Sequence, residues 1–271
     1  MTASVISLNS FSQMKKNAKK FAVLTAYDAG FSREMDEAGI PLILVGDSLG
    51  MVVQGRNATT AVTLRDMCYH TKAVCRGVER ALVMADLPFM SYPTPVDAIS
   101  SAADLMRNGA SIIKLEGGSW LIPTIEQMAE RGIPVCGHLG LTPQTAISLG
   151  GFRMQGKTEP GAKLILEDAI RLQDAGASML VVECVPASLG ARLASELTIP
   201  VIGIGAGPDT DAQVLVMHDM LGLGDGPKPR FVKNFLENAG SVRAAFIAFR
   251  KDVESGIYPA PEHSYRPGIR T

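Results

Sequence analysis

Eight short apolar segments recur along the chain, and they restrict the possible folds more than any other feature. They lie at 21–27, 42–47, 81–87, 112–117, 135–140, 179–185, 201–207 and 213–219. Most are apolar at nearly every position until their last residues, which is typical of strands buried on both faces of a parallel sheet. Amphipathic segments separate most of them, for example at 63–76, 94–108 and 162–175. This alternation predicts parallel strands joined by helices.

The expected helices end in a repeated way, with a glycine before the next strand, as in EAGIPLILV and DAGASMLVV. The 271 residues divide into eight units of about 34 residues. The number of units favours a closed (β/α)8 TIM barrel over an open sheet. Residues 230–254 are expected to add two C-terminal closing helices, broken at Gly240. Because no Pro-, Ser- and Gly-rich linker interrupts the chain, we predict a single domain over residues 1–271.

Composition excludes several classes of function. The net charge is -1, so the chain lacks the basic surplus of a typical nucleic-acid-binding protein. It has no apolar run of about 18 residues, and we therefore expect no membrane span. The 4 cysteines include no C-x-x-C pair and are expected to be structural. Since no secretory signal is visible either, we expect a soluble, cytoplasmic protein.

Carboxylates gather at the ends of the expected strands. Most of the eight strands run into one, and among these residues are Asp28, Asp47, Asp86, Glu116 and Glu183. In a (β/α)8 barrel the carboxyl ends of all the strands meet at one mouth, where catalytic groups lie. The alternative for any one of these acids is that it caps the helix that follows. For the whole set, the pattern favours a catalytic centre.

Acids crowded into one cavity repel each other unless a cation neutralises them. Because carboxylate oxygens are hard ligands, Mg²⁺ is the natural cation here. Asp47 and Asp86, from neighbouring strands, would hold it directly, and Glu116 would add a direct or water-mediated contact.

Other polar residues in these strands also point to chemistry. Lys114 would bind a substrate carboxylate, act as a Schiff-base amine, or form an ion pair with Glu116. Glu183 ends a strongly apolar strand, where burial would raise its pKa toward the range of a general base. His138 is either a donor to a developing enolate or a structural residue. The GIGAG segment at 203–207 fits phosphate binding and close backbone packing equally well.

Several longer motifs resemble one family. They are TAYD (25–28), VGDSLGMVVQG (45–55), ADLPFM (85–90), KLEGG (114–118), PVCGHLGLTPQ (134–144), GGFRMQGK (150–157), ECVP (183–186), IPVIGIGAG (199–207) and SGIYP (255–259). In this order, from about residue 4 to 264, they are similar to the ketopantoate hydroxymethyltransferase family. VGDSLGM and GHLGLTPQ together are highly specific.

The resemblance implies a barrel of the phosphoenolpyruvate mutase and isocitrate lyase group. It also implies transfer of a hydroxymethyl group from 5,10-methylenetetrahydrofolate to 3-methyl-2-oxobutanoate through a Mg²⁺-stabilised enolate. The product would be 2-dehydropantoate, on the route to pantothenate and coenzyme A. The family is cytoplasmic and forms large homo-oligomers, commonly decamers.

By the same resemblance, some residues acquire specific roles. Asp47, Asp86 and Glu116 correspond to the family's Mg²⁺ ligands, and Ser48, Asp86 and Lys114 to its oxo-acid contacts. Glu183 corresponds to the proton acceptor, and we expect His138 to assist it.

Two other functions fit the same fold. The first is a Mg²⁺-dependent mutase or C–C lyase acting on a 2-oxo acid, although the K-[KR]-C-G-H-type cysteine loop expected of those enzymes is absent from the sequence. The second is a non-catalytic metabolite-binding scaffold. Fold alone does not separate the three.

Overall fold

Eight parallel strands form a closed barrel in the computed structural model, which describes residues 6–224 and 228–265. Each strand pairs with the next along the chain, and the last pairs with the first. The strands are β1 (Phe21–Thr25), β2 (Leu42–Val45), β3 (Leu82–Asp86), β4 (Ile112–Glu116), β5 (Val135–Gly140), β6 (Met179–Glu183), β7 (Val201–Ile204) and β8 (Ala212–Leu215). The predicted (β/α)8 barrel is therefore confirmed.

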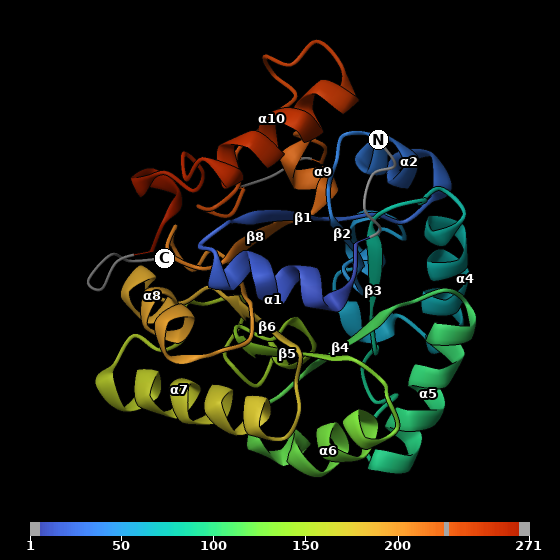
Figure 1. Ribbon diagram of the computed structural model, residues 1–271, viewed down its shortest axis with the longest axis vertical. Helices are drawn as coiled ribbons and strands as arrows, with labels where there is room; N and C mark the ends of the chain where they lie inside the picture. Colours follow the sequence, from blue (N-terminus) through green and yellow to red (C-terminus); the bar gives the residue numbers. More distant parts are fainter. Residues whose placement is uncertain (1–5, 225–227, 266–271) are drawn as a thin grey trace.

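Helices surround the barrel (Figure 1). The outer ones are α2 (Ala29–Glu37), α4 (Leu64–Cys75), α5 (Pro95–Arg107), α6 (Ile122–Glu130), α7 (Glu159–Asp174), α8 (Ala187–Glu196) and α10 (Val242–Glu254). None of the helices in the described part of the chain is both long and apolar enough to cross a membrane. The terminal residues 1–5 and 266–271 of the predicted single domain, and residues 225–227, lie outside the described residues.

Local sequence signals set the limits of several helices. The Thr63 and Thr94 hydroxyls accept hydrogen bonds from backbone N–H groups in the first turns of α4 and α5. Gly39 and Gly176 follow α2 and α7 with φ of 81° and 106°, a conformation that side chains with a Cβ rarely adopt. The expected helix boundaries at these positions are therefore correct to within a few residues.

Two predicted elements are wrong. The strand expected at 213–219 ends at Leu215, and the short helix α9 (Met217–Met220) follows it. Of the two closing helices expected over 230–254, only α10 forms, beginning after the Ser241 cap. The segment before it is irregular, although Phe231 and Phe235 are buried. The apolar spacing before α10 therefore reflects the burial of Phe231 and Phe235 as single side chains and not a helix.

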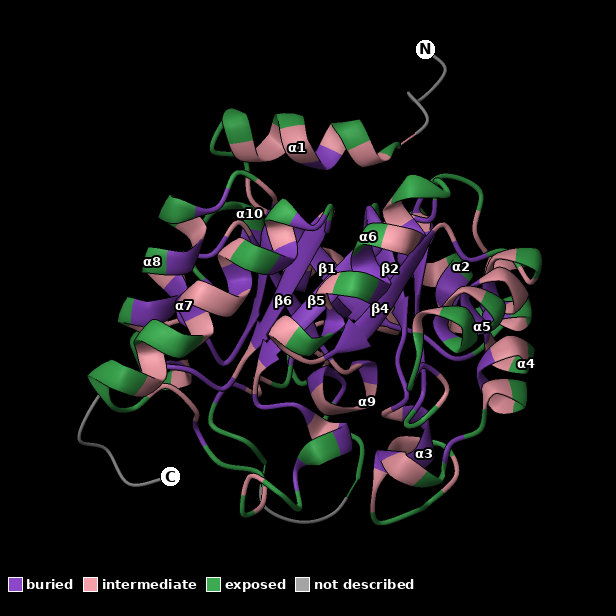
Figure 2. Ribbon diagram, turned by 90° about the horizontal axis from the view of Figure 1, so that it is seen from below, coloured by how far each residue is buried: buried purple, intermediate pink, exposed green. Residues whose placement is uncertain are grey.

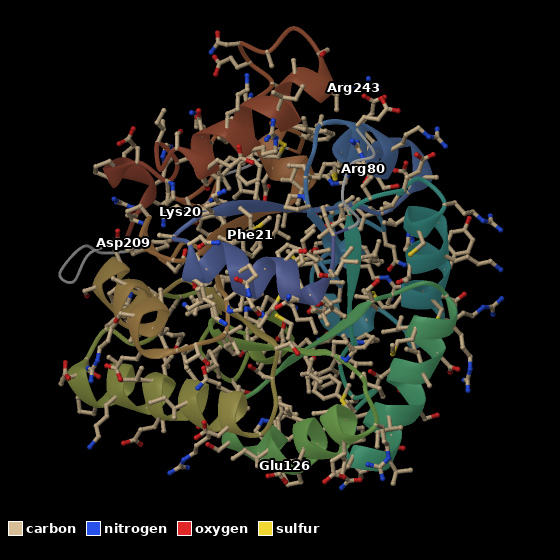
Figure 3. All side chains as sticks on the ribbon, viewed as in Figure 1. Lys20, Phe21, Arg80, Glu126, Asp209 and Arg243 are labelled. Carbon is tan, nitrogen blue, oxygen red and sulfur yellow. The ribbon has the colours of Figure 1, made fainter. Side chains whose placement is uncertain are left out.

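Helix α1 (Leu8–Lys16) covers the amino-terminal end of the barrel. In Figure 2 it crosses one end of the strands, whereas α3 (Leu49–Val52) and α9 lie at the other end. Phe11 of α1 is fully buried against Phe21, with ring centroids 4.8 Å apart, and Figure 3 shows Phe21 beside this helix. Lys15 forms an ion pair with Asp211 at 2.6 Å. One end of the barrel is therefore closed, and the opposite end is left for the site.

Thr63→Ala is expected to lower the free energy of unfolding by about 1 kcal/mol, because the first turn of α4 loses its cap. The Thr63 side chain and that of Asp66 bond reciprocally to each other's backbone N–H. Urea denaturation measures the change. Thr63→Ser keeps the hydroxyl and should retain most of the stability; an equal loss in both variants would contradict a capping role.

Candidate active site

A cavity of about 820 Å³ opens where the strands end. All the residues predicted for the site line it, and these are Asp47, Ser48, Asp86, Lys114, Glu116, His138 and Glu183. They come from the last residues of β3, β4 and β6, from the middle of β5, and from the turn between β2 and α3. The prediction that the strand ends share one cavity therefore agrees with the structure.

Asp86 is the centre of the charged network. Its Oδ1 lies 2.6 Å from Lys114 Nζ, and its Oδ2 accepts a hydrogen bond from the Asp47 backbone N–H at 3.0 Å. The parallel register places Asp86 directly beside Lys114 on neighbouring strands. The ion pair considered for Lys114, with Glu116, is therefore wrong, because the partner of Lys114 is Asp86.

Lys114 is suited to binding an anion rather than to forming a Schiff base. Burial alone would lower its pKa, but the carboxylates of Asp86, Glu116 and Asp47 outweigh this and raise the pKa above its usual range. A Schiff-base amine needs the opposite shift, because only the unprotonated amine is a nucleophile.

His138 lies between two carboxylates. Its Nδ1 is 3.4 Å from Glu116 Oε1, and its Nε2 is 3.3 Å from Glu183 Oε2. Burial, followed by the charge of Lys114, lowers the pKa of His138, so the imidazole is neutral near pH 7. Neither ring nitrogen makes a hydrogen bond with a described residue in this arrangement, and a neutral ring carries one N–H for only one of the two carboxylates. His138 therefore lies between the acid cluster and Glu183, within reach of both.

The acids on the cavity floor carry more negative charge than the protein itself neutralises. Asp47, Asp86 and Glu116 are each 3% exposed and share one buried lysine. Burial, and then repulsion from Asp86 and Glu116, raise the pKa of Asp47 well above its usual range. Burial also raises the pKa of Glu116, to about 7. A hard divalent cation would relieve this repulsion.

The geometry limits how such a cation is held. Among the described residues, no three His, Cys, Asp or Glu side chains converge into a ready-made metal cage. The protein would therefore supply few direct ligands and leave the other positions to water or substrate oxygens. Mg²⁺ commonly binds in this way, so the donor set fits it.

Gln144 is a site residue that the sequence analysis missed. It is buried in the turn after β5, where its backbone N–H donates to Glu116 Oε2 at 3.0 Å and its Nε2 donates to Asp47 Oδ2 at 2.8 Å. Tyr92 Oη donates to Gln144 Oε1 at 2.6 Å. Gln144 therefore fixes two of the three acids relative to each other. Its place in the GHLGLTPQ motif was the only available signal.

Some strand-end residues have structural roles instead. Asp28 caps α2 by accepting hydrogen bonds from the N–H groups of Gly30 and Phe31, as the alternative for such acids predicted. In the 203–207 segment, a Cβ on Gly205 would lie 2.7 Å from Phe231 Cδ1, which favours the close-packing interpretation.

The four cysteines are free thiols.

Comparison with known proteins identifies the family. The model of the ketopantoate hydroxymethyltransferase family matches residues 5–261. The chain belongs to this family. It is 54% identical over 260 residues to 3-methyl-2-oxobutanoate hydroxymethyltransferase 2 of Hahella chejuensis, covering 96% of this chain and 98% of the relative. It is 56% identical over 255 residues to 3-methyl-2-oxobutanoate hydroxymethyltransferase of Yersinia pestis, covering 94% and 96%. Like other ketopantoate hydroxymethyltransferases, the protein is a transferase.

Solved structures show how the ketopantoate hydroxymethyltransferase fold relates to other barrels. Phosphonopyruvate hydrolase in complex with oxalate and Mg²⁺ is similar with a TM-score of 0.62 and 12% identity, covering 95% of this chain and 93% of the hydrolase. 2,3-Dimethylmalate lyase, of the PEP mutase/isocitrate lyase superfamily, gives a TM-score of 0.58 and 15% identity, covering 79% of each chain. These likenesses show that the chain shares the barrel fold of these two proteins.

Proposed function

We propose that the protein transfers a hydroxymethyl group from 5,10-methylenetetrahydrofolate to 3-methyl-2-oxobutanoate and forms 2-dehydropantoate, on the route to pantothenate. The observation that carries this proposal is the position of His138 between Glu183 and a buried cluster of acids and Lys114, all lining one cavity. New C–C bond formation at C3 requires removal of the C3 proton, and Glu183 is the carboxylate placed beside, rather than inside, the acid cluster.

Asp47 and Asp86 would hold Mg²⁺ directly, and Glu116 would do so directly or through water. When bound, Mg²⁺ supplies Lewis-acid polarisation of the substrate's 2-oxo group, which makes the C3 proton more acidic. Asp86 also holds Lys114 in place, and Gln144 orients Asp47 and Glu116. The acid positions are thereby set before any ligand enters.

Lys114 and Ser48 would bind the substrate carboxylate. Lys114 is buried and keeps its proton, so it offers a permanent positive charge at the cavity floor. Ser48 Oγ lies 3.0 Å from Tyr27 Oη, a contact that orients the hydroxyl. Together they would fix the oxo acid with C3 toward Glu183.

Glu183 would act as the general base. Its side chain is 14% exposed, and burial raises the pKa of the carboxyl above its usual value, which strengthens it as a base. His138 would orient Glu183 through Nε2. When Glu183 takes up the C3 proton and becomes neutral, His138 would remain beside it as a hydrogen-bonding partner.

Gln144→Leu is expected to weaken divalent-cation binding by about 10–100-fold, because it removes the side-chain donor that orients Asp47, while the backbone N–H that holds Glu116 is retained. Calorimetric titration with Mg²⁺ measures this. Gln13→Leu, on exposed α1 at the far end of the barrel, is the control. Equal affinities in the two variants would contradict the orienting role.

As the pH is lowered, activity is expected to fall at a higher pH than it would if the general base were a glutamate with an ordinary pKa. The base must be ionised, and the pKa of Glu183 is raised above 4.5, so turnover is lost as the pH falls through that raised value. The measurement is kcat against pH at saturating Mg²⁺ and both substrates. A rate that stays constant down to pH 4.5 would argue against Glu183 as the base.

Chelation tests the proposed metal. Treatment with EDTA should abolish 2-dehydropantoate formation, and Mg²⁺ in excess of the chelator should restore it. Full turnover by the protein after dialysis against EDTA would overturn the metal part of the proposal.

We also propose a cytoplasmic location and a homo-oligomer, commonly a decamer in this family.

A further inference from the structure

Tyr92 connects the segment between β3 and α5 to the acids of the cavity floor. Its hydroxyl accepts a hydrogen bond from the Glu116 backbone N–H at 3.3 Å and donates to Gln144 Oε1 at 2.6 Å. The Glu116 carbonyl lies farther from the hydroxyl, at 3.2 Å, so the single phenol hydrogen goes to the amide. Because the Gln144 backbone N–H donates back to Glu116 Oε2, the three residues form a closed ring of hydrogen bonds.

This ring fixes the orientation of the Gln144 amide. Its Nε2 uses both hydrogens, donating to Asp47 Oδ2 at 2.8 Å and to the Leu87 carbonyl at 2.9 Å. Its Oε1 is buried and needs a donor of its own, and Tyr92 is the only described residue that supplies one. A buried carbonyl left without a donor is costly, so the phenol hydroxyl holds the amide with its N–H groups toward Asp47.

The Tyr92 ring is held in turn by Trp120, the single tryptophan of the chain. The two rings are nearly parallel, at 12°, with centroids 6.0 Å apart. The indole fits beside the end of β4 because residue 117 is a glycine, where a Cβ would overlap Trp120 Nε1. Tyr92 itself is 5% exposed, so packing leaves its hydroxyl little freedom to leave Gln144.

We propose that Tyr92 is a positioning residue for the divalent cation, acting through the Gln144 amide on Asp47. The inference rests on the proposed function, in which Asp47 is a metal ligand. Neither Tyr92 nor Gln144 is among the described residues that line the cavity, so both act from behind its floor. Without the phenol O–H the amide would turn more freely, and the Asp47 carboxylate would lose its fixed donor. Partners of this kind, which hold a metal ligand without touching the metal, set its affinity.

Tyr92→Phe tests the proposal, because it removes the hydroxyl and keeps the ring. Calorimetric titration with Mg²⁺, without substrate, should show affinity lower by about 3–10-fold, the loss expected for one hydrogen bond. At saturating Mg²⁺, kcat should stay within about twofold, since the cation restores the position of Asp47 once bound. Fluorescence of Trp120 should be unchanged, because the stacked ring remains. Tyr69→Phe, the same change at a tyrosine that is 72% exposed on α4, is the control and should bind Mg²⁺ as the unchanged protein does.

A double-mutant cycle asks whether Tyr92 acts through Gln144. Added to Gln144→Leu, Tyr92→Phe should change the Mg²⁺ affinity by less than about twofold, because the amide that carries its effect is already gone. Equal affinities in Tyr92→Phe and Tyr69→Phe would overturn the proposal. A loss of the same size with and without Gln144 would also overturn it, because that indicates a general structural effect. If the unchanged protein bound no Mg²⁺, the metal part of the proposed function would fail, and this inference with it.

Discussion

Glu183→Gln is expected to slow removal of the C3 proton by about 10²–10⁴-fold, the usual contribution of a general base. Glutamine keeps the shape of the side chain and its place beside His138 but does not accept the proton. Deuterium exchange into 3-methyl-2-oxobutanoate reports this step directly. Mg²⁺ binding should be unchanged, since Glu183 is proposed to lie outside the metal ligands.

The matched control is Glu167→Gln, which makes the same chemical change on α7, where the side chain is 46% exposed. It should retain full exchange and turnover. If Glu183→Gln exchanged the proton at the rate of this control, another group would have to be the base, and the proposed role of Glu183 would be wrong.

Asp86→Ala is expected to remove activity and to lower the free energy of unfolding by about 3–5 kcal/mol. The reason for the loss of stability is that Lys114, 4% exposed, would be left as a buried charge without its closest partner. Urea denaturation measures the change. Activity would be lost separately, because Asp86 is a proposed metal ligand.

A second substitution separates these two effects. The Asp86→Ala/Lys114→Met variant removes both charges, and it should regain most of the lost stability because no buried lysine remains unpaired. It should stay inactive, since neither the metal ligand nor the cation is restored. A single variant as stable as the unchanged protein, or a double variant that regains turnover, would contradict the account of this pair.

The barrel and the strand-end acids were predictable because both depend on local pattern. Apolar runs define buried strands, and a parallel barrel brings all their ends together, so Asp86, Glu116 and Glu183 were expected to share a cavity. The same signature also selected Asp28, which caps a helix. Sequence position alone does not distinguish a side chain that turns into the mouth from one that folds back onto the next helix.

Other features depend on contacts between distant segments. The partner of Lys114 follows from the register of β3 and β4, which the order of the strands does not specify. Gln144 reaches Asp47 across 97 residues of sequence, from a turn with no strand or helix pattern. The irregular segment before α10 buries two phenylalanines without forming a helix, so its apolar spacing was misleading.

The most direct test of the central claim is proton NMR of 3-methyl-2-oxobutanoate in D₂O with the protein and Mg²⁺, with and without 5,10-methylenetetrahydrofolate. The account predicts loss of the C3 proton signal in both samples and formation of 2-dehydropantoate only with the folate. Exchange without product in the presence of folate would indicate a mutase or lyase acting through the same site. Neither exchange nor product, from folded protein with Mg²⁺ bound, would contradict the account.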